Sequence, residues 1–112
     1  MRKLKDIAQI VETKMVRGEP YEIWATATAQ YDEAGSKLVV ELESFVRRVN
    51  LRGADADFKR AWLPALDTVK DSVPIEEAYL EANEIFSRWA HRVRASIPST
   101  SELEAELHKA PA

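Results

Sequence analysis

The stretch that decides the fold runs from residue 20 to residue 51 and reads PYEIWATATAQYDEAGSKLVVELESFVRRVNL. Apolar side chains recur in it every three or four residues, which is the spacing of one face of an α-helix. These positions are Ile23, Trp24, Ala27, Tyr31, Ala34, Leu38, Leu42, Phe45 and Val49. Alanine also favours helices over strands. The pattern therefore predicts one long helix, continuous or kinked at Gly35.

The same stretch has a second interpretation as a β-hairpin. Apolar and polar residues alternate from Tyr21 to Tyr31, and residues 32–35 would form a four-residue loop. Leu38, Val40 and Leu42 would then share a face with the alanines of the first strand. Trp24 falls on the wrong face of this hairpin, and the alternation fails at Phe45 and Val46. Because the helix accounts for more positions, the hairpin is the alternative.

Helical spacing extends outward from this stretch in both directions. The apolar positions are Leu4, Ile7, Ala8, Val11 and Met15 before it, then Phe58, Ala61, Trp62, Ala65, Leu66, Val69 and Val73 after it. Residues 75–97 show the clearest pattern, an apolar stripe that falls within about 140° of arc and consists of Ile75, Ala78, Tyr79, Ala82, Ile85, Phe86, Trp89, Ala90, Val93 and Ile97. Gly18 is expected to end the first helix. Capping-box patterns at Ser99–Glu102 and Ser101–Glu104 predict a short terminal helix.

These segments predict an all-α fold, a small antiparallel bundle of four main helices plus a short C-terminal helix. Residues 1–98 would form the bundle domain, and residues 99–112 the short helix and tail. The alternative is an α+β fold in which a β-hairpin at about 21–46 packs on helices. Trp24, Trp62 and Trp89 each lie on an apolar stripe, so we expect all three in one core.

Composition limits the functional classes. The chain has 112 residues, 46% of them hydrophobic and 31% charged, which is typical of one globular domain. A net charge of −3 argues against a dedicated nucleic-acid binder. The chain contains no cysteine, which excludes a disulfide framework and a thiol nucleophile. No apolar run approaches the roughly 18 residues that span a bilayer. The sequence therefore predicts a cytoplasmic protein without a membrane partner.

One carboxylate cluster is a candidate metal site. Glu77, Glu81 and Glu84 share the polar face of the clearest helix, and hard cations such as Mg²⁺ bind carboxylate oxygens. They would make the protein a small all-α metal-dependent hydrolase, which is the alternative function. A solvated surface is the simpler interpretation, because the glutamates lie opposite the apolar stripe. The sequence predicts no cofactor and favours a protein that is not an enzyme.

A basic cluster surrounds the connection after the long segment. It consists of Arg47, Arg48, Arg52, Lys59 and Arg60. Such a cluster would suit phosphate or an acidic partner. Asp55 and Asp57 interrupt it, and the overall balance is acidic, so a nucleic-acid partner is not expected.

Isolated apolar residues are the last candidate feature. Val40 and Leu80 interrupt the polar faces of their expected helices, and together with Leu51, Leu103 and Leu107 they would mark an interface if they lay close together. A helix of about 30 residues would span roughly 45 Å, too long for its neighbours to cover. We therefore expect a non-enzymatic helical protein–protein interaction or assembly module. Its partner would be a second copy in a homodimer, or another protein.

Overall fold

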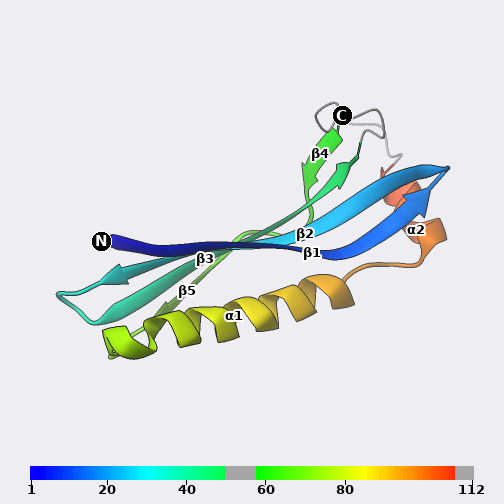
Figure 1. Ribbon diagram of the computed structural model, residues 1–112. Helices are drawn as coiled ribbons and strands as arrows, with labels where there is room; N and C mark the ends of the chain where they lie inside the picture. The colour runs from blue at the N-terminus through cyan, green and yellow to red at the C-terminus, as the bar shows by residue number, and fades with distance from the viewer. Residues whose placement is uncertain (50–57, 108–112) are drawn as a thin grey trace.

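The computed structural model describes residues 1–49 and 58–107, which form a long antiparallel sheet with a helix along one face (Figure 1). The elements are β1 (Arg2–Val16), β2 (Glu19–Asp32), β3 (Lys37–Arg48), β4 (Phe58–Ala61), β5 (Leu66–Lys70), α1 (Ile75–Ala95) and α2 (Thr100–Leu107). The molecule is elongated, with extents of 50 × 27 × 26 Å. The predicted all-α bundle is therefore wrong, and the architecture is α+β with more of the described residues in strands than in helices.

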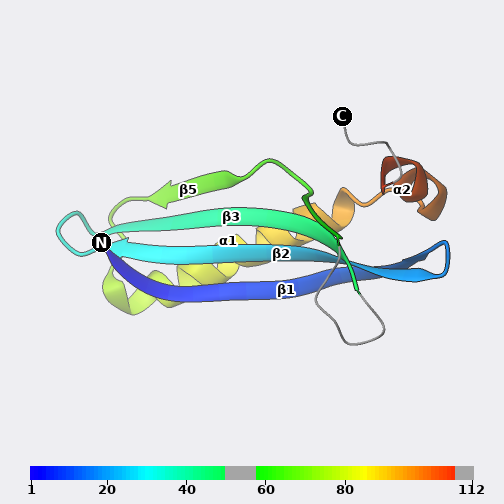
Figure 2. The same cartoon turned by 90° about the horizontal axis from the view of Figure 1, so that it is seen from above.

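The sheet has the order β1-β2-β3, and two short strands share the far edge of β3. β4 pairs with Phe45–Arg48, and β5 pairs with Leu38–Leu42. Figure 2 shows β1, β2 and β3 side by side, with β5 along β3 and α1 behind the sheet. Between β4 and β5 the chain contains Pro64, which has no N–H to donate to a neighbouring strand. The predicted third helix over 58–73 is thus wrong, because these residues form two edge strands.

The stretch from residue 20 to residue 48 is a β-hairpin, so the predicted long helix is wrong and the hairpin alternative is correct. β2 and β3 pair without interruption from Tyr21 opposite Arg48 to Asp32 opposite Lys37. Every second residue of β2 from Tyr21 to Tyr31 is buried on the face that α1 covers. Trp24 and Phe45, which seemed to break the alternation, lie on the opposite face of the sheet.

Two β-bulges explain why the first strand resembles a helix in sequence. The register between β1 and β2 shifts between Lys3 and Lys5 and again between Ile10 and Glu12. Each bulge adds one residue to a strand and changes the phase of its alternation. Leu4, Ile7 and Val11 all pack on the core, yet they are three and four residues apart. A bulged strand has here produced the spacing that is typical of a helix.

The turn between β1 and β2 uses backbone conformations that glycine adopts freely. Arg17 and Gly18 are its two residues, and both have positive φ, 52° and 78°. This is the type I′ turn, whose twist matches that of the strands it joins. Gly18, predicted to end a helix, instead closes a β-hairpin.

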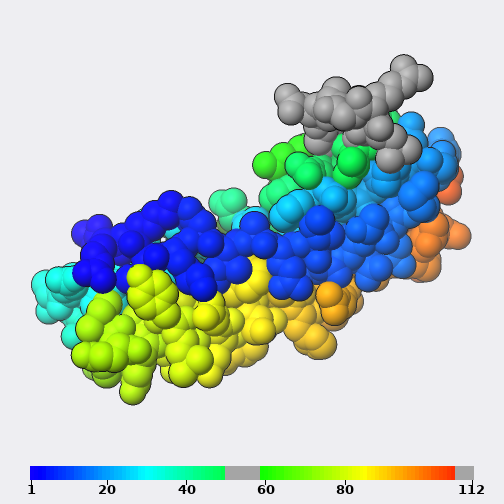
Figure 3. Space-filling model, in the orientation of Figure 1, coloured from blue at the N-terminus to red at the C-terminus, as the bar shows by residue number. Residues whose placement is uncertain are grey.

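The helix α1 confirms the clearest part of the sequence pattern. Its buried residues are Ala78, Ala82, Ile85, Phe86, Trp89, Ala90 and Val93, all from the predicted stripe. They share one core with the buried alanines of β2, Ala25, Ala27 and Ala29. Small side chains on both surfaces let the helix lie close to the sheet, which explains three alanines in a central strand. In Figure 3, α1 runs in yellow along the underside of β1.

The predicted C-terminal helix is present as α2. The backbone N–H of Leu103 donates to the Ser99 carbonyl, and the N–H of Glu102 donates to Ser99 Oγ. Leu103 and Leu107 are buried in the common core. Neither helix in the described part of the chain is long and apolar enough to cross a membrane.

Candidate interaction surface

The face of the sheet opposite α1, here called the open face, is covered by no helix or strand among the described residues. Strand register arranges its side chains in rows that cross the sheet. The cationic row is Thr13, Glu22, Arg47 and Lys59, and the aromatic row beside it is Ile10, Trp24, Phe45 and Ala61. Next come Ala8, Thr26 and Glu43, then an acidic row of Asp6, Thr28, Glu41 and Asp67. Lys3, Gln30, Val39 and Val69 form the last row.

The aromatic row places two large rings side by side on this surface. The ring centroids of Trp24 and Phe45 are 5.9 Å apart, and the ring planes differ by 12°. Both residues are half-buried, and Ile10 beside them is 39% exposed. Cross-strand aromatic pairs of this kind stabilise a sheet and leave apolar surface available for contact.

The cationic row covers the edge of the aromatic row. Arg47 Cζ lies 5.1 Å from the centroid of the Trp24 ring, and Lys59 Nζ lies 4.2 Å from that of Phe45. Arg47 Nε donates to Glu22 Oε1 at 2.8 Å, and Trp24 Nε1 donates to the same oxygen at 3.2 Å. Arg47 is thus held in place by a carboxylate, whereas Lys59 has no ion pair among the described residues.

The acidic row lies on the other side of the aromatic row. Glu41 and Asp67 are exposed neighbours on β3 and β5, and neither has an ion pair within residues 1–49 and 58–107. A hydrogen bond from Lys3 Nζ holds the pKa of Asp6 below its ordinary value. Asp6 therefore stays ionised at neutral pH, and the row presents carboxylates on the open face.

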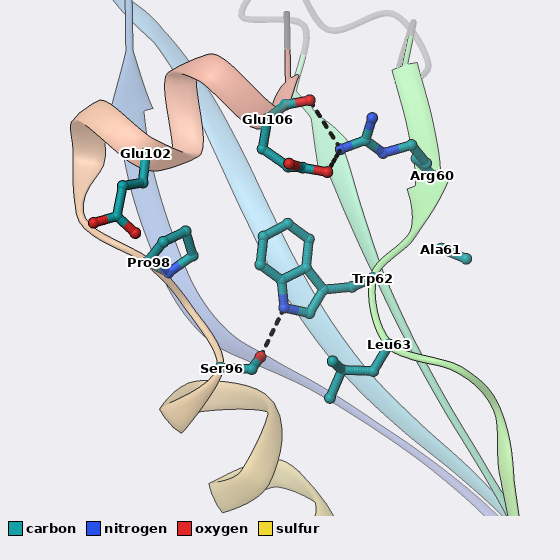
Figure 4. Close-up of a pocket in the computed structure, with 8 residues that line it drawn as sticks. All are labelled: Arg60, Ala61, Trp62, Leu63, Ser96, Pro98, Glu102 and Glu106. Atoms are coloured by element: carbon teal, nitrogen blue, oxygen red, sulfur yellow. Dashed lines mark hydrogen bonds and ion pairs between the residues drawn. The ribbon is translucent and has the colours of Figure 1, made fainter. Parts of the chain in front are cut away.

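A pocket of about 340 Å³ opens at one end of the molecule, between β4 and α2 (Figure 4). The Trp62 indole lies in its centre, and its Nε1 donates to Ser96 Oγ at 2.8 Å. Arg60 bridges to α2 by donating to the Glu106 carbonyl at 3.3 Å, with the Glu106 carboxylate 3.9 Å away. Its arginine, indole and serine thus serve to tie β4 to the C-terminal segment.

The structure does not bring the predicted interface residues together. Val40, Leu103 and Leu107 are buried in the chain's own core, where they are not accessible to a partner. Leu80 is 61% exposed on the outer side of α1. Leu51 lies outside the described residues.

The predicted basic cluster is divided between the two faces of the sheet. Arg47 and Lys59 belong to the open face, as described above. Arg48 and Arg60 lie on the other face, where Arg48 pairs with Glu19 at 2.8 Å and Arg60 contacts α2. Arg52 lies outside the described residues. The four described cations therefore form no single patch.

The candidate metal-ligating glutamates do not converge. Glu81 forms an ion pair with Lys70 of β5 at 2.6 Å, while Glu77 and Glu84 are exposed on α1. Across residues 1–49 and 58–107, no group of three histidine, aspartate or glutamate side chains is placed to hold a metal ion. The all-α fold that the hydrolase alternative assumed is wrong.

Sequence reasoning missed Trp24 and Phe45 as surface residues, although a signal for them existed. Both residues failed to fit the alternation of the hairpin, and a large apolar residue that points away from the buried face is a sign of exposure.

Comparison with protein-family models, curated proteins and solved structures finds no match to this chain.

Proposed function

We propose that this protein is a non-enzymatic interaction module that self-associates by packing the open faces of two copies against each other. The observation that carries the proposal is the order of the rows, an apolar row placed between a cationic row and an acidic row. A sheet with one core-facing side leaves its other side for solvent or for a partner. The exposed apolar side chains of Ile10 and Val69 favour a partner.

Symmetry makes the open face complementary to itself. Most homodimers have a two-fold axis, and for two stacked sheets that axis lies between them. When the axis runs across the strands, between the aromatic row and the row of Thr26, the direction of each strand is reversed in the second copy. The cationic row of one copy then faces the acidic row of the other. Arg47 lies opposite the partner's Glu41, and Lys59 opposite the partner's Asp67.

The same axis places apolar and small side chains opposite one another. Trp24 would lie over the partner's Thr26, and Ile10 over the partner's Ala8, so that large residues face small ones. The strands of the two sheets run nearly antiparallel in this arrangement, which suits the aligned packing of sheets about 10 Å apart. Two-fold stacking thus pairs opposite charges in the outer rows and places large residues against small ones on β1 and β2, while Phe45 lies opposite the partner's Glu43.

The open face is large enough for a stable contact. Its four strand positions and five rows cover about 20 by 30 Å, roughly 600 Å² per copy. Two copies would bury about 1,200 Å², the lower end of the range for specific protein interfaces. We therefore expect a dimer that forms reversibly at micromolar concentrations. A cytoplasmic location remains a prediction from the sequence.

Single-stranded nucleic acid is a second candidate occupant, favoured by one observation. Exposed aromatic rings beside cations on a sheet are the way several modules stack bases. Carboxylates outnumber cations on the open face, however. The carboxylates are Asp6, Glu22, Glu41, Glu43 and Asp67, and the cations are Lys3, Arg47 and Lys59. Phosphate would be repelled by this balance, so a second copy fits better.

Size-exclusion chromatography with light scattering, over a range of protein concentrations, tests the proposal. The wild type is expected to approach the mass of a dimer as concentration rises. Replacing both rings, in Trp24→Thr/Phe45→Thr, is expected to leave a monomer throughout that range. Threonine suits strands and removes the apolar contact, so the sheet itself should persist.

The matched control is Tyr79→Thr/Leu80→Thr, which removes two exposed apolar side chains from α1. This variant is expected to dimerise like the wild type. A wild type that stays monomeric at high concentration would refute self-association. Loss of the dimer in the control alone would assign the interface to α1. A mass increase only on addition of a single-stranded oligonucleotide would favour the nucleic-acid alternative.

A further inference from the structure

A second cavity lies on the opposite side of the sheet from the open face, between β5 and the C-terminal half of α1. Its volume is about 240 Å³, and its lining residues are Leu42, Leu66, Thr68, Ile85, Arg88, Trp89 and Arg92. Leu42, Ile85 and Trp89 are buried and form its apolar wall, whereas Leu66 at the mouth is 42% exposed. The cavity is separate from the open face, so a ligand could bind there whether or not the protein self-associates.

Two arginines lie at this cavity without carboxylate partners. Arg88 and Arg92 are one helical turn apart on α1, and both are exposed. Arg88 Nε contacts the carbonyl of Glu84 in its own helix at 3.4 Å, and Arg92 Cζ lies 5.5 Å from the centroid of the Trp89 ring. Neither guanidinium has an ion pair among the described residues. Like charges at this spacing repel, so an anion between them is favourable.

We infer that this cavity binds a small monocarboxylate with an apolar body. The carboxylate would accept hydrogen bonds from Arg88 and Arg92, since guanidinium groups match the geometry of a carboxylate. The body would enter between Leu66 and Trp89. A cavity of about 240 Å³ has room for a short alkyl chain.

The three tryptophans report on three separate places in the molecule. Trp24 lies on the open face, Trp62 lies in the end pocket, and Trp89 lines the carboxylate cavity. The Trp89 Nε1–H donates to the Glu43 carbonyl at 2.8 Å, so its indole signal has a fixed environment. A ligand in the cavity is expected to shift this indole signal and leave the other two unchanged.

The experiment is a titration of the ¹⁵N-labelled protein with octanoate, followed by the three indole N–H signals in two-dimensional NMR. We expect a saturable shift of the Trp89 signal alone, with a dissociation constant on the order of 0.1–1 mM for a ligand of this size. Octanamide, which has the same apolar body without the charge, is expected to bind with an affinity at least about tenfold lower.

The test variant is Arg88→Gln/Arg92→Gln, expected to weaken octanoate binding about tenfold or more while leaving the fold intact. The control is Arg2→Gln/Arg17→Gln, which removes the same charge from the two ends of β1, where Arg2 pairs with Glu33 and Arg17 with Glu104. It is expected to bind octanoate like the wild type. The inference is overturned if the Trp89 signal does not saturate. It is equally overturned if the wild type binds octanamide as tightly as octanoate and the Arg88/Arg92 variant binds octanoate as tightly as the wild type does.

Discussion

Trp89→Ala is expected to lower the free energy of unfolding by about 3–5 kcal/mol. The Trp89 side chain is 3% exposed and belongs to the core between α1 and the sheet. Truncation removes its packing and also the hydrogen bond from its Nε1 to the Glu43 carbonyl. That carbonyl belongs to the part of β3 between the segments paired with β4 and β5. Urea unfolding followed by circular dichroism measures the loss, and the melting temperature should fall by roughly 12 °C or more.

Tyr79→Ala on the same helix provides the comparison. Tyr79 is 46% exposed, so its truncation is expected to cost less than about 1 kcal/mol. Equal losses for the two variants would contradict the orientation of α1 against the sheet. A protein that has lost only local packing should also keep the far-ultraviolet spectrum of the wild type below its melting temperature.

Reversing one charge on the open face is expected to weaken self-association about tenfold or more, because the two-fold axis makes each changed contact occur twice. Lys59→Glu places two carboxylates opposite each other, and Asp67→Lys places two ammonium groups opposite each other. The double variant Lys59→Glu/Asp67→Lys restores the attraction with the signs exchanged. Analytical ultracentrifugation of the four proteins gives the dissociation constants and hence the coupling between the two positions.

Recovery in the double variant would be specific to contact between copies. Lys59 lies opposite Arg47 in the sheet and Asp67 lies opposite Glu41, so they are about 20 Å apart within one chain. At that distance exposed charges are largely screened at physiological salt. If the two losses of dimer affinity add, so that the double variant associates more weakly than either single variant, the proposed alignment of the cationic and acidic rows is refuted.

The helix α1 could be predicted from the sequence because everything that defines it is local. Its apolar stripe, its acidic first turn at Glu76 and Glu77, and its basic last turn at Arg92 and Arg94 all lie within one segment. The seven buried residues of α1 all come from that stripe. The capping pattern at Ser99 predicted α2 for the same reason.

The strands could not be predicted in the same way, because their patterns depend on distant partners. The bulges of β1 follow from its register with β2, and they turned a strand into an apparent helical stripe. The alanines of β2 are explained only by the close approach of α1, which lies some fifty residues later in the sequence. Tertiary packing thus overrode intrinsic propensity.

The open face was hidden from the sequence for a related reason. Its rows combine residues from separate strands, and a register shift of one residue would place every side chain on the other face. Arg47 and Lys59 were recognised as basic residues, but their position over Trp24 and Phe45 required the pairing of β3 with β2 and β4. The carboxylates of the acidic row showed no motif at all.

The most direct test of the stacked open faces is cross-linking through a single introduced cysteine, since the chain contains none of its own. Ala8→Cys lies beside the proposed axis, with its two copies roughly 12 Å apart from strand rise and sheet spacing. Leu80→Cys, on the outer side of α1, is the control. With a short bismaleimide, we predict rapid formation of a covalent dimer by Ala8→Cys and little by Leu80→Cys. Equal cross-linking of the two variants, or faster cross-linking through Leu80→Cys, would contradict packing through the open face.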